Sequence, residues 1–244
     1  MSVIVLSVTL LASVVAAADP ALIARVEPAA TRYHEDPKAL DRLYEDLTRA
    51  AEGDEPRLDV LVALARIAFV WGDVRATSAE QKLEAYDRGR QAARRAIELD
   101  RKSAPAHFWY ATNTARWGQV KGIVRSLFLL PEVRRGIDTV LELDPTFAAV
   151  YALAGNVYYE LPGLFGGDLA KAETMFRKGL ELDPHFTAMR VGLGKTLIRR
   201  GRVAEARREL ERVLADPAPT NRANFTVQDA PEARRVLESI REKS

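Results

Sequence analysis

The sequence features that could support phosphate or metal chemistry do not have the required spacing. The triplet Gly194-Lys195-Thr196 resembles the end of a phosphate-binding loop, in which a lysine and a hydroxyl contact nucleotide phosphates. Such a loop needs a glycine at the position of Met189 and lies between a strand and a helix, whereas this triplet falls inside an expected helix. The histidines His34, His107 and His185 are widely spaced, and the chain has no cysteine. We therefore predict no cofactor and no metal site.

The chemistry that remains is binding by a row of cationic, amide and aromatic side chains. Arg66, Asn156 and Lys195 are expected at equivalent heights on three helices, among apolar neighbours. Such a row suits an extended peptide or a carboxylate-bearing ligand, because cationic side chains donate strong hydrogen bonds to carboxylates. The alternative is that these cations are simply solvated. The predicted groove residues are Arg66, Phe69, Phe108, Thr112, Arg116, Asn156, Tyr159 and Lys195.

The helices that must position these side chains form a pattern that recurs along the chain. In the segment 187–217, the spacing of Gly194, Gly201 and Ala206 fits two antiparallel helices joined by a tight turn, with small residues where the helices touch. The phrase Glu-Leu-Asp occurs at 98–100, 142–144 and 181–183, each time after the same arrangement of small residues. The recurrence indicates a helical repeat.

From about residue 57 to 217, these motifs resemble the tetratricopeptide repeat family. The resemblance implies an all-α fold, a right-handed helical solenoid with one continuous core, that acts by holding a partner. Residues 19–56 are expected to form N-terminal helices or a degenerate half-repeat, and residues 218–244 a C-terminal capping helix. No nucleophile motif is present, so we predict no catalytic residues and a chain that is not an enzyme.

Three of the repeats are longer than the standard period. The equivalent positions Leu61, His107, Tyr151 and Arg190 are 46, 44 and 39 residues apart, against a standard spacing of about 34. The extra residues fall between the two helices of a repeat, which predicts enlarged loops on one edge. They are apolar, so they should add to the core, line a ligand pocket or form a subunit interface with a further copy of the chain. The predicted apolar pocket or interface consists of Trp117, Ile123, Leu127, Phe128, Leu164 and Phe165.

Two of these insertions resemble a narrower group of tetratricopeptide proteins. The run from Tyr158 to Asp168, with Leu-Pro-Gly and Gly-Gly-Asp, and the stretch from Trp117 to Pro131 are similar to T-components of tripartite ATP-independent periplasmic (TRAP) transporters. The resemblance implies a periplasmic scaffold whose protein partner is a solute-binding protein. The alternative function is binding of a small apolar or carboxylate ligand between the insertions. Without cysteine, the chain has no site for the lipid anchor found in many members of that group.

The N-terminal residues 1–18 are predicted to be a signal peptide. Val3 to Val15 is almost wholly apolar, and Ala16-Ala17-Ala18 precedes Asp19, as at a cleavage site. The run is shorter than the roughly 20 residues of a membrane span. No Lys or Arg precedes it, so either the true start lies upstream or the signal is weak. The sequence thus predicts an exported, soluble periplasmic protein, and its net charge of only +2 does not indicate nucleic-acid binding.

Overall fold

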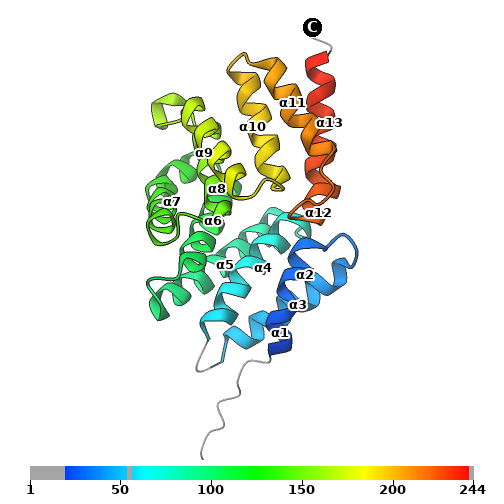
Figure 1. Ribbon diagram of the computed structural model, residues 1–244. Helices are drawn as coiled ribbons and strands as arrows, with labels where there is room; N and C mark the ends of the chain where they lie inside the picture. The colour runs from blue at the N-terminus through cyan, green and yellow to red at the C-terminus, as the bar shows by residue number, and fades with distance from the viewer. Residues whose placement is uncertain (1–19, 54–56, 242–244) are drawn as a thin grey trace, which may run out of the picture.

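The regular elements of the protein are all helical, as the sequence predicts. The computed structural model describes residues 20–53 and 57–241, and these ranges contain helices and no strand (Figure 1). The signal peptide predicted at residues 1–18 lies outside the described residues. Within the described ranges, no helix combines the length and the apolar character that a bilayer crossing requires.

The helices stack as successive hairpins along the chain. The N-terminal part comprises α1 (Pro20–Ala24), α2 (Val26–Thr31) and α3 (Pro37–Ala51). Four hairpins follow: α4 (Leu58–Val74) with α5 (Ala79–Leu99), α6 (Ala104–Lys121) with α7 (Ile123–Leu143), α8 (Ala148–Glu160) with α9 (Leu169–Leu182), and α10 (Thr187–Arg199) with α11 (Val203–Leu214). The chain ends with α12 (Arg222–Asn224) and α13 (Ala230–Arg241). The first helices of the hairpins pack in two pairs, α4 with α6 and α8 with α10, and we call these four helices the inner row.

Small residues lie where the helices approach most closely. A Cβ atom added to Gly155 on α8 would come within 2.5 Å of the Phe176 ring on α9. In the last hairpin, a Cβ on Gly194 would come within 2.8 Å of Leu210, and Ala206 is fully buried. The close approach predicted for the helices of Gly194 and Ala206 is therefore confirmed.

The repeated Glu-Leu-Asp phrase builds the turns between hairpins. Its aspartate stands at the C-terminal cap of α5, α7 and α9. In each turn, a carboxylate oxygen accepts a hydrogen bond from the backbone N–H two residues later, at 2.9 Å for Asp100, 2.9 Å for Asp144 and 3.0 Å for Asp183. This local bond closes the turn without a glycine. The phrase recurs because each hairpin needs the same turn to reach the next one.

The insertions differ from the predicted enlarged loops in two of the three repeats. Only Gly122 separates α6 from α7, and its φ of +100° is a conformation that favours glycine. The extra residues of that hairpin therefore lengthen its helices, and α4 and α5 are similarly long. Only the third insertion is a loop, which contains the 3₁₀ turn η1 (Gly163–Phe165). Leu and Arg favour helix, and the leucine-rich start of α7 forms one helix that continues through Pro131.

The segment between α11 and α13 returns to the N-terminal part of the molecule. We call residues 218–229, which include α12 and the π-helix η2 (Phe225–Asp229), the C-terminal strap. The Tyr33 hydroxyl donates to Asn224 Oδ1 at 2.9 Å, and Asn221 Nδ2 donates to the Ala30 carbonyl oxygen at 3.2 Å. Ala223 is fully buried in the apolar cluster of the N-terminal helices. The strap thus joins the two ends of the stack, and Figure 1 shows α12 beside α2.

One carboxylate of the strap is buried. Asp229 Oδ2 accepts a hydrogen bond from the Thr187 hydroxyl at 2.7 Å. Burial raises the pKa of Asp229 above its ordinary value of 3.8, and the Thr187 hydrogen bond opposes this only in part. A raised pKa means that the folded state keeps this proton to a higher pH than the unfolded state does. The stability contributed by Asp229 is therefore greatest below pH 3.8 and decreases as the pH rises through the folded-state pKa.

Replacing Asp229 by Asn is expected to raise the free energy of unfolding at pH 7, because the amide carries no charge and its oxygen can still accept the Thr187 bond. The variant should also lose the part of the parent's pH dependence that lies above pH 3.8. Urea unfolding followed by circular dichroism between pH 4 and 7 measures both effects. Asp41→Asn is the matched control and should instead lower the free energy of unfolding at pH 7, because hydrogen bonds from Arg75 hold the pKa of Asp41 below its ordinary value. Equal responses of the two variants would contradict the assignment.

Candidate binding groove

The predicted groove residues on α4 and α6 divide into two groups. Phe69 and Arg116 lie together, with the Arg116 guanidinium 5.7 Å from the centre of the Phe69 ring. Arg66 lies further toward the N-terminal helices and pairs with Glu27 of α2 at 2.6 Å. Phe108 and Thr112, in contrast, are buried. Their assignment to the groove is wrong, because both side chains pack within the stack.

The remaining predicted groove residues form a second group on α8 and α10. The Tyr159 ring lies 5.5 Å from Lys195 Nζ and 4.7 Å from the Arg199 guanidinium. Lys195 also lies 3.7 Å from a Glu232 carboxylate oxygen of α13. Asn156 is exposed on the same helix as Tyr159. This group holds cations against an aromatic ring, and its ammonium is already partly neutralised.

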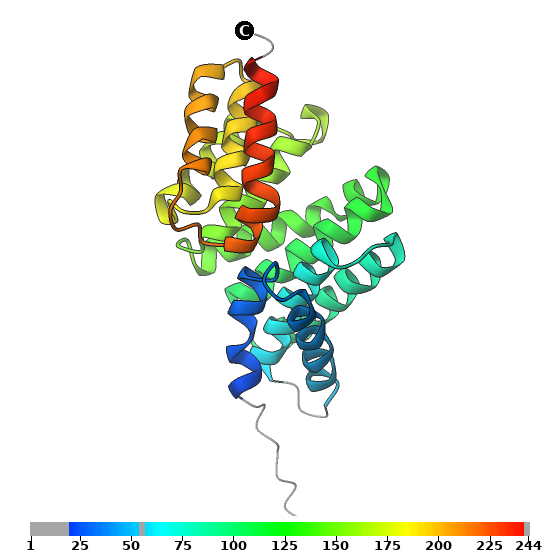
Figure 2. The same cartoon turned by 90° about the vertical axis from the view of Figure 1, so that its right-hand side faces the viewer.

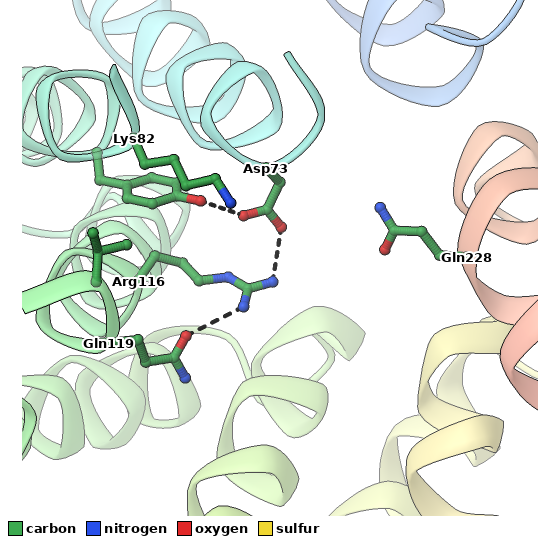
Figure 3. A pocket seen from close by; sticks show the side chains of 7 residues that line it. Asp73, Lys82, Arg116, Gln119 and Gln228 are labelled. Carbon is green, nitrogen blue, oxygen red and sulfur yellow. Dashed lines mark hydrogen bonds and ion pairs between the residues drawn. The ribbon is translucent and has the colours of Figure 1, made fainter. Parts of the chain in front are cut away.

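A cavity of about 280 Å³ lies beside Arg116 (Figure 3). The Asp73 carboxylate at the end of α4 accepts a hydrogen bond from the Tyr86 hydroxyl at 2.6 Å and pairs with Arg116 at 2.7 Å. Another guanidinium nitrogen of Arg116 donates to Gln119 at 3.2 Å. These contacts come from α4, α5 and α6, so the packing of two hairpins fixes the position of the guanidinium.

Two further side chains complete the cavity wall. Lys82, near the start of α5, forms no ion pair with any described residue. Gln228 of the C-terminal strap faces Asp73 and Arg116 from the opposite side (Figure 3). The strap therefore brings an amide from the far end of the chain to the inner surface of the first hairpins.

The cavity is electropositive and rich in hydrogen-bond donors. Lys82 and Arg116 carry two positive charges against the single negative charge of Asp73. Burial, and secondarily the charge of Asp73, raise the pKa of Tyr86, so its hydroxyl remains protonated. A carboxylate entering the cavity would meet the Lys82 ammonium and the amide donors. This arrangement suits an anionic group.

The charge of the inner row extends this preference beyond the cavity. Helices α6 and α10 contain no Asp or Glu, and the one acidic residue of α8 is Glu160 at its last position. The second helices, α5, α7, α9 and α11, mix acidic and basic residues. In α4 the two aspartates, Asp59 and Asp73, are paired with Arg57 and Arg116. Unpaired acidic side chains are thus few on the inner row, which favours a negatively charged partner.

The predicted apolar pocket residues do not line the cavity. Neither the cavity beside Arg116 nor a second one of about 270 Å³ beside Arg95 contains any of the six. Leu127 is half-buried, whereas Ile123, Phe128, Leu164 and Phe165 are exposed. Trp117 is covered by cationic side chains. The insertions therefore do not add to the core, and the alternative of an apolar surface remains.

Lys82, Tyr86 and Gln228 were missed by the sequence reasoning. Lys82 and Tyr86 stand on a second helix, which the repeat pattern does not place in the groove. Gln228 reaches the cavity only because of the strap, for which the sequence gives no periodic signal. Within residues 20–53 and 57–241, no group of three or more His, Cys, Asp or Glu side chains could hold a metal ion.

Two family models together match most of the chain. The model of the family described as "Regulator of microtubule dynamics protein 1-3" matches residues 22–164, which is more than half of the chain. A tetratricopeptide repeat model matches residues 166–224. These matches support the predicted repeat family, but they do not show the predicted resemblance to transporter T-components.

Individual relatives agree with the family match. Regulator of microtubule dynamics protein 1 of Bos taurus is 27% identical over 175 residues, covering 65% of this chain and 55% of that protein. Protein 3 of Rattus norvegicus is 25% identical over 197 residues, covering 74% of this chain and 42% of that protein. The chain thus spans about half the length of the curated relatives it matches.

A solved structure supports the fold alone. A thermophilic tetratricopeptide protein of Thermus thermophilus aligns with a TM-score of 0.61 at 17% identity, covering 84% of this chain and 98% of that one. Its helical repeats agree with the stacked hairpins described above. On the match that covers residues 22–164, the chain belongs to the regulator of microtubule dynamics protein 1-3 family.

Proposed function

We propose that the protein is a non-enzymatic scaffold that binds an acidic segment of a protein partner along its inner row of helices. The observation that carries the proposal is the cavity lined by Lys82 and Arg116, beside inner-row helices of which α6 and α10 contain no acidic residue. Repeat solenoids commonly bind extended segments along their concave surface. A glutamate or aspartate side chain of the segment would enter the cavity.

The cavity suits a side chain better than a separate ligand. Its volume of about 280 Å³ lies just below the range of about 300–1,000 Å³ that is typical of small-molecule sites. The wall is polar, with Asp73, Lys82, Arg116 and Gln119, whereas small-molecule sites are mostly apolar. Binding of a small apolar acid, the alternative predicted from the sequence, is therefore the weaker proposal.

The family match supports a proposal for the class of partner. Because the relatives are named as regulators of microtubule dynamics, we propose a partner from the microtubule system and not a periplasmic solute-binding protein. The solute-binding partner and the export step rest only on the sequence resemblance and on residues 1–18. Microtubules are thus the first large partner to test, by co-sedimentation.

Reversal of one cavity charge should weaken binding of an acidic peptide. The full chain is expected to bind fluorescein-labelled decaglutamate and not decalysine, measured by fluorescence anisotropy. Lys82→Glu should weaken the decaglutamate affinity about tenfold or more, because a charge-assisted hydrogen bond contributes about 1.5–3 kcal/mol and 1.4 kcal/mol is a factor of ten. Lys178→Glu is the matched control, since Lys178 is an exposed lysine on α9, away from the inner row.

Equal weakening by the two lysine variants would mean that only net charge matters and would contradict a specific site. Absence of decaglutamate binding by the parent would contradict the proposed function as a whole. Peptide binding without microtubule co-sedimentation would keep the acidic groove and reject the proposed partner class.

A further inference from the structure

An exposed apolar surface covers the end of the second hairpin. We call residues 117–131 the α6–α7 tip. On α7, Val124 and Phe128 are one turn apart and 65% and 76% exposed, and Ile123 beside them is 63% exposed. Adjacent large apolar side chains with this exposure form a patch, which on soluble proteins usually marks a contact surface.

The tip also carries unneutralised positive charge. From Arg116 to Pro131 the sequence has three basic residues and no Asp or Glu. Two of them, Lys121 and Arg125, form no ion pair with any residue in the described ranges. Both lie over the Trp117 ring, with Lys121 Nζ at 5.3 Å and the Arg125 guanidinium at 6.0 Å from its centre. The cations therefore surround an aromatic side chain at the base of the apolar patch.

We propose that the α6–α7 tip docks reversibly on the surface of an anionic phospholipid bilayer. Ile123, Val124 and Phe128 would enter the boundary between headgroups and acyl chains, as the apolar faces of interfacial helices do. Lys121 and Arg125 would remain at the level of the lipid phosphates. Trp117 would lie between them, at the depth where tryptophan is enriched in membrane proteins.

The charge of the tip selects a bilayer over a second copy of the chain. A two-fold contact between copies places the same surface on both sides of the interface. Lys121 and Arg125 would then face the same cations, because the tip offers no carboxylate to neutralise them. An anionic bilayer supplies negative phosphates to both.

The shape of the molecule leaves the tip accessible. In Figure 2 the paired ends of α6 and α7 project from the side of the stack, beside the turn between α4 and α5. A projecting end can reach a flat surface while the groove stays open to a partner. The proposal therefore adds a second binding surface and does not depend on the proposed groove function.

A fluorophore at the tip tests this docking directly. The chain has no cysteine, so Val124→Cys in the full chain can be labelled at one site with an environment-sensitive nitrobenzoxadiazole group. Its emission should rise and shift to the blue with phosphatidylcholine vesicles that contain phosphatidylserine, and much less with phosphatidylcholine alone. Because the readout is local, it is independent of membrane contacts made by other parts of the chain. Leu99→Cys is the matched control, because Leu99 is 55% exposed and is the last residue of α5, whose first residues lie beside the tip.

Second substitutions in the labelled protein complete the test. Phe128→Asp, or Lys121→Ala with Arg125→Ala, should weaken the apparent vesicle affinity about tenfold or more. The proposal is overturned if the label at position 124 does not respond, if position 99 responds equally, or if neither second substitution weakens binding. It is also overturned if the emission changes with protein concentration in the absence of vesicles, which would assign the patch to self-association.

Discussion

Replacing Phe176 by Ala is expected to lower the free energy of unfolding by about 3–5 kcal/mol, the usual cost of truncating a buried phenylalanine. Phe176 on α9 is 1% exposed. Its ring contacts the glycine positions of two other helices, since a Cβ on Gly155 of α8 or on Gly192 of α10 would come within 2.5 Å or 2.7 Å of it. The ring thus connects three helices across two hairpins. Urea unfolding monitored by circular dichroism measures the loss.

Phe165→Ala is the matched control for this substitution. Phe165 belongs to the loop between α8 and α9 and is 46% exposed, so the same truncation removes little buried area. We expect a change of less than about 1 kcal/mol. If the two variants lost the same stability, the assignment of Phe176 as the residue that links the third and fourth hairpins would be wrong.

Replacing Gly136 by Leu should destabilise the second hairpin by about 1–3 kcal/mol or more, because overpacking forces helices apart. A Cβ on Gly136 of α7 would lie 2.7 Å from the Cβ of Ala111 on α6. Both atoms are fixed to their helix backbones, so neither can move aside as the end of a long side chain can. Unfolding in urea measures the cost.

Gly53→Leu makes the same change where there is space. The nearest atom to a Cβ on Gly53 is the Ala50 carbonyl oxygen at 3.7 Å, an ordinary contact distance. This variant should unfold within about 0.5 kcal/mol of the parent. A Gly136→Leu protein that unfolded at the same urea concentration as Gly53→Leu would show that α6 and α7 are not in close contact.

The helix pairs could be predicted from the sequence because their signals are local. Gly194 on α10 and Ala206 on α11 lie on either side of the tight turn at Gly201, and the aspartates of the Glu-Leu-Asp turns bond to backbone groups only two residues away. The prediction of enlarged loops was wrong in two repeats, because excess length does not distinguish a loop from a longer helix. The prediction of a loop around Ile123 and Phe128 rests on excess length alone, whereas the leucines and the arginine of this stretch favour a helix.

The groove was only partly predictable, because the position of a residue within the repeat does not specify how deeply its side chain is buried. Arg116 is at the cavity, but Phe108 and Thr112 on the same helix are buried by the neighbouring elements. Lys82 comes from the second helix of its hairpin, and Gln228 comes from the strap. Their positions depend on contacts between distant parts of the chain, which no spacing within one repeat encodes.

The C-terminal strap changes how the protein should fold and unfold. In an open repeat array each unit touches only its neighbours, so the end units fray first and folding can start anywhere. Here Tyr33 bonds to Asn224, 191 positions later, and Ala223 is buried among the N-terminal helices. Neither end can open without loss of contacts at the other. The array is thus expected to unfold as one cooperative unit. Its folding is expected to include a slow step, in which contacts form between residues 191 positions apart.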